Sequence, residues 1–255
     1  MDSKIFASPS QAPYIERHRH ELKRRSLTVL STAYVTPAML RISLRYDGPP
    51  DFISLAPDDH IKIFVDDGNG GANSRDYTPR WHDASTQTVA IDFAVHDAGP
   101  ATVWAISAQE GDTLNVAGPR GSVVISSVSN WLLVGDETAL PAMGRRIEEA
   151  VSDTTITAII TVANEAERQT FETAAKLSVH WIYRPLEEAS NPAPVLSVLS
   201  TLGLTKNTFA WVAAEAKVAR AVKAFLLEER GHPPIWLKAA GYWVMGHADS
   251  HDKLD

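Results

Sequence analysis

The residues of this chain that are best suited to bind a ligand lie in two short segments. The first, residues 75–78, reads Arg-Asp-Tyr-Thr and offers a cation, a phenol and a hydroxyl. The second, residues 96–105, turns through Gly99-Pro100 into an apolar, helix-like stretch. A Gly-Pro turn that opens a helix leaves backbone N–H groups unpaired at the positive end of the helix dipole. That position is favourable for a phosphate.

The side chains of the first segment complement such a phosphate site. Arg75 could bind the phosphate through two parallel hydrogen bonds. Tyr77 could lie on an aromatic ring system, and Thr78 could hydrogen-bond to its edge. The two segments together predict a site for a dinucleotide that carries a large flat ring. Taken alone, an Arg-x-Tyr-Thr tetrapeptide is more often an ordinary strand.

Four motifs of the chain resemble, in order, the motifs of one protein family. They are Arg75-Asp76-Tyr77-Thr78, then residues 96–105, then Gly135-Asp136-Glu137-Thr138-Ala139-Leu140-Pro141-Ala142, and finally Gly241-Tyr242-Trp243 with Gly246 and His251-Asp252. The first resembles the flavin motif Arg-x-Tyr-Ser/Thr of the ferredoxin–NADP reductase superfamily. The set resembles its siderophore-interacting branch, the FAD-dependent ferric-siderophore reductases. Each motif alone is weak, but four in order from about residue 20 to the C-terminus make the resemblance specific.

The resemblance implies that FAD contacts both the N-terminal half and the C-terminal end. Arg75 would bind the pyrophosphate, Tyr77 would pack against the flavin or ribose, and Thr78 would donate to the flavin edge. Thr78, at the flavin edge, is the one catalytic side chain expected, and no side-chain acid or base is expected. The full set for FAD is Arg75, Asp76, Tyr77, Thr78, Asp92, His96, Gly99, Pro100, Ala101, Thr102, Gly241, Tyr242 and Trp243.

A second nucleotide site is expected in the C-terminal half. Residues 135–142 follow an apolar run, and a strand, a glycine turn and a helix N-terminus form the arrangement that nucleotides use in open α/β sheets. Asn164 and Glu215 follow later predicted strands and should lie at the same edge. Asp136 has the alternative role of a helix cap. The set expected for NADPH or NADH is Asp136, Glu137, Thr138, Ala139, Asn164 and Glu215.

The substrate implied by the resemblance is a ferric siderophore, whose anionic complex a cationic rim would attract. Lys62 and Arg120 are expected there, although an outward-facing strand Lys and a solvated turn Arg are equally good interpretations. Lys238 is a further candidate because Val244 stands where the family usually has Arg. Asp97 stands where the family usually has Gly. The polar terminal run of residues 247–252 contains metal-binding residue types, but no metal site is expected.

Composition excludes several classes of function. Hydrophobic residues make up 44% of the 255 residues and charged residues 22%, as in ordinary globular proteins. The net charge of −7 argues against a nucleic-acid binder. The chain has no cysteine, so redox chemistry has to come from a bound organic cofactor. Neither a signal-peptide core nor a run of eighteen apolar residues is present, which predicts a cytoplasmic, non-membrane protein.

The hydrophobic pattern predicts two domains. Short β-type runs punctuated by Gly, Pro and Asp predict a six-stranded antiparallel β-barrel over residues 20–127 for FAD; they are residues 27–35, 39–45, 61–65, 89–95, 112–116 and 123–125. Residues 1–20 are expected to be a frayed or surface-laid terminus, and residues 66–73 a flexible loop. Continuous apolar strands then alternate with helices over residues 128–255, which predicts an open parallel α/β sheet for NAD(P)H. The helices are expected at residues 140–151, 165–171, 191–202 and 216–229.

The sequence therefore predicts a monomeric, NAD(P)H-dependent FAD enzyme that reduces ferric siderophores. Two alternatives remain open at this stage. One is a flavin reductase of the same superfamily with another acceptor, such as free flavin, a ferredoxin or a quinone. The other is a binder that holds flavin or a siderophore without turnover.

Overall fold

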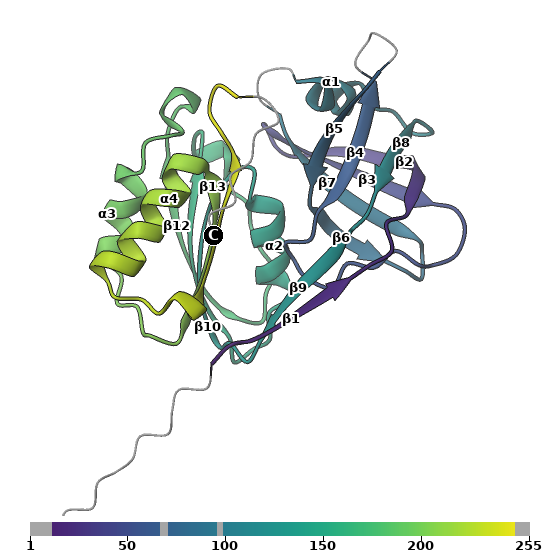
Figure 1. The fold of residues 1–255 in the computed structure, drawn as a ribbon. Helices are drawn as coiled ribbons and strands as arrows, with labels where there is room; N and C mark the ends of the chain where they lie inside the picture. The colour runs from purple at the N-terminus through teal and green to yellow at the C-terminus, as the bar shows by residue number, and fades with distance from the viewer. Residues whose placement is uncertain (1–11, 67–70, 96–98, 248–255) are drawn as a thin grey trace, which may run out of the picture.

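The computed structural model describes residues 12–66, 71–95 and 99–247. The chain forms an antiparallel half and a parallel α/β half, and helix α2 (Leu140–Glu148) lies between them (Figure 1). None of the helices in these described ranges is long and apolar enough to cross a membrane.

The antiparallel half is one curled sheet of seven strands in the order β5-β4-β8-β2-β3-β7-β6. Thr78 alone joins the two edge strands β5 and β6, so the sheet must curl back on itself. Its inner face carries alternating apolar residues such as Leu40, Ile42 and Leu44, each at most 3% exposed. The strands are β2 (Arg24–Thr36), β3 (Met39–Tyr46), β4 (Ile61–Asp66), β5 (Ala72–Tyr77), β6 (Pro79–Asp83), β7 (Thr88–Ala94) and β8 (Thr113–Ala117).

The prediction of an antiparallel N-terminal sheet is confirmed, but the strand inventory differs. Five of the six predicted runs lie in the sheet, and the polar stretches β5 and β6 add two strands. The sixth run belongs to β9 (Gly121–Ser126), which pairs antiparallel with β1 (Tyr14–Arg19). For residues 14–19 a frayed terminus is therefore wrong, whereas the alternative of a terminus laid on the surface fits this mostly exposed strand. Of the predicted loop, residues 67–70 lie outside the described residues, and residues 72 and 73 begin β5.

The C-terminal half is a parallel sheet in the order β12-β11-β10-β13-β14, as the strand–helix alternation predicted. Strand β10 is buried on both faces, which explains its continuous apolar sequence: Trp131 and Leu133 face α2, and Leu132 and Val134 face the other helices. The strands are β10 (Asn130–Asp136), β11 (Thr155–Val162), β12 (Lys176–Tyr183), β13 (Thr208–Glu215) and β14 (Leu237–Trp243).

Helices cover both faces of this sheet. The α-helices besides α2 are α3 (Ala193–Thr201) and α4 (Ala216–Ala224), and α4 continues as a π-helical turn over Phe225–Glu229. The predicted helix at residues 165–171 is only a 3₁₀ turn, Glu165–Glu167. Further 3₁₀ turns are Leu186–Glu188 and Pro234–Trp236. The strand order reverses between β10 and β13, and the carboxyl ends of strands at such a point commonly bind ligands.

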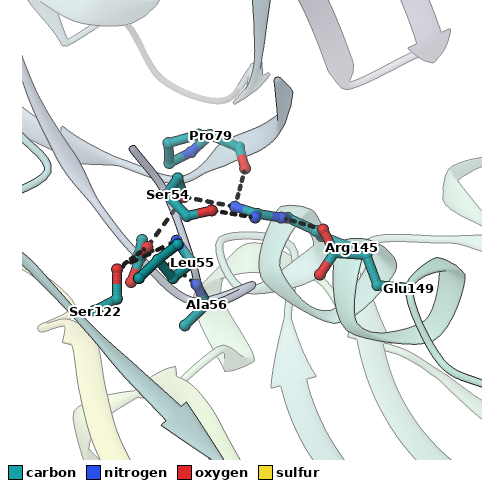
Figure 2. Close-up of polar contacts among 8 residues, drawn as sticks. Ser54, Leu55, Ala56, Pro79, Ser122, Arg145 and Glu149 are labelled. Carbon is teal, nitrogen blue, oxygen red and sulfur yellow. Dashed lines mark hydrogen bonds and ion pairs between the residues drawn. The ribbon is translucent and has the colours of Figure 1, made fainter. Parts of the chain in front are cut away.

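Arg145 of α2 joins the two halves (Figure 2). Its guanidinium donates to the Ser54 hydroxyl at 2.7 Å, to the Ser54 carbonyl at 2.9 Å and to the Pro79 carbonyl at 3.3 Å. Its Nε donates to Glu149 at 2.6 Å. Because the side chain is only 4% exposed, these partners compensate a buried charge.

Further contacts also cross between the halves. Arg80 of β6 donates to Glu148 at the end of α2 at 2.6 Å. Glu167, 7% exposed, accepts from the Thr36 hydroxyl at 2.5 Å and from the Ala38 amide at 3.0 Å. These contacts fix how the carboxyl edge of the parallel sheet meets the antiparallel sheet. The domain boundary at residues 127 and 128 stays a prediction.

Candidate cofactor and substrate site

The structure brings the two FAD segments of the sequence together. Helix α1 (Pro100–Ser107) packs against β4, β5 and β7. Tyr77 on β5 stacks on Phe93 with ring centroids 4.5 Å apart, and Phe93 lies 5.9 Å from Trp104 of α1. This row of rings places residues 75–78 beside the start of the helix. Burial raises the pKa of Tyr77 to about 12, so its phenol stays neutral at physiological pH.

The N-terminus of α1 has the form expected of a phosphate site. Gly99 is the N-cap in extended conformation, Pro100 occupies the first turn, and none of the described side chains caps the helix. The backbone N–H groups of Ala101 and Thr102 are therefore left for a ligand. Arg75, half-buried on the adjacent strand, supplies a guanidinium and donates to the Ser74 carbonyl at 2.8 Å. This arrangement fits the pyrophosphate of FAD.

The remaining FAD candidates of this half have different surroundings. Thr78 is 8% exposed between the two edge strands. Asp92 is 1% exposed and accepts from Arg41 at 2.7 and 2.8 Å, and Arg80 Nε lies 3.7 Å away. This carboxylate thus has cationic partners within the sheet, and its contact with FAD stays a prediction. His96 and Asp97 lie outside the described residues.

Of the predicted substrate cations, Lys62 lies on β4 and Arg120 lies in the turn between β8 and β9. Lys62 of β4 forms an ion pair with Asp76 of β5 at 3.0 Å, so its charge is shared with a predicted FAD residue. Ala117 of β8 pairs with Lys62 in the sheet, and Arg120 follows three residues later. The exposed Arg120 side chain makes no hydrogen bond or ion pair with the residues that the structure describes. Of the two, Arg120 is the cation that is open to an anion.

The Asp136 carboxylate connects the strand ends at the carboxyl edge of the parallel sheet. Its Oδ1 accepts from the Thr138 amide at 3.0 Å and the Thr138 hydroxyl at 2.6 Å. Its Oδ2 accepts from the Glu215 amide at 2.8 Å and from Trp243 Nε1 at 2.9 Å. The carboxylate, on a residue 3% exposed, therefore holds the ends of β10, β13 and β14 in place.

Glu215 and Gly135 also serve the scaffold of this edge. Glu215 is fully buried; its Oε2 accepts from the Lys217 amide at 2.6 Å as the cap of α4, and its Oε1 accepts from the Met245 amide at 3.2 Å. At Gly135, a Cβ would lie 2.6 Å from Met143 Sδ, so glycine is needed for α2 to approach β10. Asp136 and Glu215 thus act as acceptors for the protein itself.

Glu137 forms an ion pair with Arg184, which follows β12. Arg184 Nη2 lies 2.9 Å from Glu137 Oε2 and 3.2 Å from Oε1, while the buried Arg184 Nη1 has no partner among the described residues. Burial raises the pKa of Glu137 to about 7; the charge of Asp136 adds to this effect and that of Arg184 opposes it. Glu137 is thus an acid at this edge whose pKa lies in the physiological range.

The other residues predicted at this edge lie as follows. Ala139 begins α2 without a side-chain cap, which leaves first-turn N–H groups. Asn164 is exposed and accepts from the Ala166 amide at 2.9 Å. Gly241 is buried opposite Ala214, and Tyr242 meets Trp211 edge-on with centroids 6.1 Å apart.

Lys238 lies away from this edge. It pairs with Trp211 in the sheet, five residues before Trp243, and forms an ion pair with the buried Asp58 of the antiparallel half. Asp58 also accepts from Trp211 Nε1 at 3.0 Å. Lys238 therefore already has an anionic partner, and its contact with a siderophore stays a prediction.

Comparison with known proteins agrees with this geometry. Residues 68–123 match the family described as siderophore-interacting FAD-binding domain, and residues 128–246 match the family described as siderophore-interacting protein. The NADPH-dependent ferric-chelate reductase of Escherichia coli (strain K12) is 30% identical over 253 residues, which cover 90% of this chain and 96% of the relative. The chain belongs to the siderophore-interacting protein family.

Other members of the family match over similar lengths. The crystal structure of a siderophore utilization protein from T. fusca superposes with a TM-score of 0.85 and 32% identity, covering 93% of this chain and 98% of that one. The ferric acinetobactin reductase of Acinetobacter baumannii is 25% identical, over 93% of this chain and 84% of the relative. The FAD segment described above lies within the region that matches the family's FAD-binding domain.

Sequence reasoning missed three arginines and one acid of this family member. Arg184 directly follows a predicted strand. Asn164 and Glu215 were selected because they follow predicted strands, and the same criterion would also have found Arg184. Arg80, Arg145 and Glu167 carried no such signal, because Glu148, Ser54 and Thr36, which they contact in the other half, are 68 or more residues away. In the described ranges no three His, Asp or Glu side chains converge as a metal site, and residues 248–252 lie outside them.

Proposed function

We propose that this protein is a ferric-siderophore reductase, which moves electrons from NADPH or NADH through FAD to Fe(III) in a siderophore and releases Fe(II). The observation that carries the proposal is the pairing of an uncapped helix N-terminus and Arg75 in the antiparallel half with a nucleotide-type strand edge in the parallel half. The whole-length similarity to a relative named NADPH-dependent ferric-chelate reductase supports it.

The antiparallel half would hold FAD. Arg75 and the first-turn N–H groups of α1 would bind the pyrophosphate, because both present donors to an anion. Tyr77, kept neutral by burial, would supply a ring face, and Thr78 a hydroxyl at the flavin edge. Tyr242 and Trp243 would close the site from the parallel half; the bond from Trp243 to Asp136 fixes the indole there.

The carboxyl edge of the parallel sheet would hold the nicotinamide cofactor. The first turn of α2 at Ala139 offers N–H groups, and Thr138 offers a side chain oriented by Asp136. Asp136 and Glu215 would act through the edge they organise, since their carboxylates are already engaged. When bound, FAD would accept a hydride from the reduced nicotinamide and supply electrons singly to the ferric substrate.

The iron is the substrate's metal and needs no side-chain ligand. Siderophore oxygens are hard, anionic ligands that hold Fe(II) less tightly than Fe(III), so reduction favours release. Arg120 and Lys62 would attract the anionic complex, with Arg120 contributing more because Asp76 offsets the charge of Lys62. Neither residue needs to move a proton.

The test is anaerobic reduction of the FAD-loaded protein by NADPH, followed by mixing with a ferric catecholate and an Fe(II)-trapping dye. We expect the yellow flavin absorbance to bleach and then return as the Fe(II) complex forms. Bleaching that only free flavin, a ferredoxin or a quinone reverses would identify a reductase with another acceptor. Absence of bleaching by either NADPH or NADH would identify a non-enzymatic binder.

The choice between NADPH and NADH, the cytoplasmic location and the monomeric state stay predictions. The ratio of kcat/KM for the two nucleotides, cell fractionation and sedimentation analysis measure them in turn.

A further inference from the structure

A cavity of about 200 Å³ lies at the amino edge of the parallel sheet. It is lined by residues 55–57 of the antiparallel half, by the end of β9 and the segment after it, by Trp131 at the start of β10, and by the last turn of α2 with the residues that follow it. Trp131 and Asp136 are five residues apart on β10, about 17 Å along an extended strand. This amino-edge cavity is therefore separate from the cofactor edge.

Arg146 places an unpaired cation in the wall of the amino-edge cavity. Its guanidinium lies over the ring of Trp131, 4.4 Å from the centroid. It makes no hydrogen bond or ion pair with any residue in the described part of the chain. Burial lowers the pKa of Arg146, and the nearby Asp58 and Glu149 oppose that effect. Because arginine stays protonated in proteins, the side chain remains a charged donor group.

The acids near Arg146 already have other partners. Glu149 also lines the cavity, but its Oε1 accepts from Arg145 Nε at 2.6 Å. Asp58 Oδ2 is engaged by Lys238 and by the indole of Trp211, while its buried Oδ1 has no hydrogen-bond partner among the described residues. Arg145, the neighbour of Arg146 on α2, is fully used in the contact between the two halves (Figure 2). Arg146 thus differs from Arg145 in making no direct hydrogen bond or ion pair in the described part of the chain, while the charges of Asp58, Asp59 and Glu149 act on it from a greater distance.

Apart from the buried Thr154, the rest of the wall is apolar. Leu55, Pro57 and Val128 contribute aliphatic surface, and Val151, 65% exposed, marks the opening to solvent. A half-buried cation with free donors beside a largely apolar wall is complementary to an anion attached to a hydrophobic body. The volume is below the range typical of drug-sized ligands, so it suits a single ring or a short branched chain and is too small for a dinucleotide.

We propose that the amino-edge cavity is a binding site for a small carboxylate with an apolar body. The carboxylate is received by the planar fork of Arg146, and the body packs against the aliphatic wall and Trp131. A ligand there contacts residues of both halves of the molecule, so it also ties loop 55–57 to the end of α2. The site is independent of the proposed reductase activity, and its test does not require turnover.

The test is calorimetric titration of the protein, loaded with FAD and saturated with NADP⁺, with benzoate. Filling both nucleotide sites restricts the probe to the rest of the molecule. We expect saturable binding at one site per chain. Benzyl alcohol, which keeps the ring but lacks the charge, and acetate, which keeps the charge but lacks the ring, should each bind at least about tenfold more weakly.

Two variants locate the site. Arg146→Gln should weaken benzoate binding at least about tenfold, because a charge-assisted pair is lost. Val151→Trp should block the opening while leaving Arg146 in place, which keeps the proposal testable if Arg146→Gln misfolds. Arg168→Gln is the matched control: Arg168 also lies over a tryptophan, Trp181, at 5.9 Å, but lines no part of this cavity. It should bind benzoate like the parent protein.

The proposal is overturned if benzoate does not saturate, if it binds no better than benzyl alcohol, or if both Arg146→Gln and Val151→Trp retain the parent affinity. Equal weakening in Arg168→Gln would also overturn it, because the effect would then reflect net charge.

Discussion

The start of α1 and the carboxyl edge of the parallel sheet use charged and polar groups in opposite ways. At α1 none of the side chains that the structure describes caps the helix, and Arg75 lies half-buried on the neighbouring strand. At the carboxyl edge Asp136 accepts four hydrogen bonds from the protein, and Glu215 caps α4. The start of α1 presents backbone N–H groups to a ligand. At the carboxyl edge, by contrast, the acidic side chains accept hydrogen bonds from the protein itself. An acidic residue at a strand end is therefore a scaffold element here, and the ligand is left with backbone N–H groups.

Replacing Asp136 should have the largest effect on this comparison. Asp136→Ala removes the shared acceptor of Trp243, Glu215 and Thr138, so buried donors lose their partner. We expect the free energy of unfolding to fall by about 3–5 kcal/mol. Urea denaturation measures it. Asp136→Asn keeps one acceptor oxygen and should lose less. A loss below about 1 kcal/mol for the alanine variant would show that the edge does not depend on this carboxylate.

Replacing Arg75 tests the other region. Because Arg75 is proposed to pair with a phosphate, Arg75→Ala should weaken FAD binding about 10- to 100-fold. Quenching of flavin fluorescence measures the affinity. Arg17→Ala, which removes the same charge from an exposed position on β1, is the control. Equal FAD affinity in the two variants would contradict the assignment of Arg75.

The contribution of Glu137 to stability should depend on pH, which gives a further test of the carboxyl edge. Its pKa in the folded protein is about 7, above the usual 4.5, so the folded state binds the proton more tightly than the unfolded state. The resulting stability is present below about pH 4.5 and is lost as pH rises through 7, a loss on the order of 1–3 kcal/mol. Denaturation at about pH 5 and about pH 8 measures it. Glu137→Gln should flatten this dependence, and Glu165→Gln, with an exposed side chain, should leave it unchanged. An identical slope in all three proteins would rule out Glu137 as its origin.

Local patterns were sufficient for most strands, helices and ligand segments. Continuous apolar runs predicted β10 and β13 because both faces of a parallel strand are buried, and the Gly99-Pro100 turn predicted the start of α1. Strand β1 was missed because it is polar and its pairing partner β9 is about a hundred residues away. The polar strands β5 and β6 were missed for a similar reason: their place depends on the curl of the whole sheet.

The candidate site was predictable by position but not by role. Strand-end counting placed Asp136, Glu215 and Trp243 at one edge, and the structure confirms that they meet there. That Asp136 serves Trp243, 107 residues away, could not be read from either segment alone. Arg145 posed the same difficulty, since its partner Ser54 lies 91 residues earlier.

The bonds of Arg145 to Ser54 and of Glu167 to Thr36 and Ala38 set a constraint on protein engineering. A chimera that joins the antiparallel half of one relative to the parallel half of another must carry over Ser54 with Arg145, and residues 36–38 with Glu167, as matched sets. Cutting the chain near residue 127 would separate the Arg145 guanidinium and the Glu167 carboxylate from their partners in the antiparallel half. The two halves should therefore be expressed together and not as separate fragments.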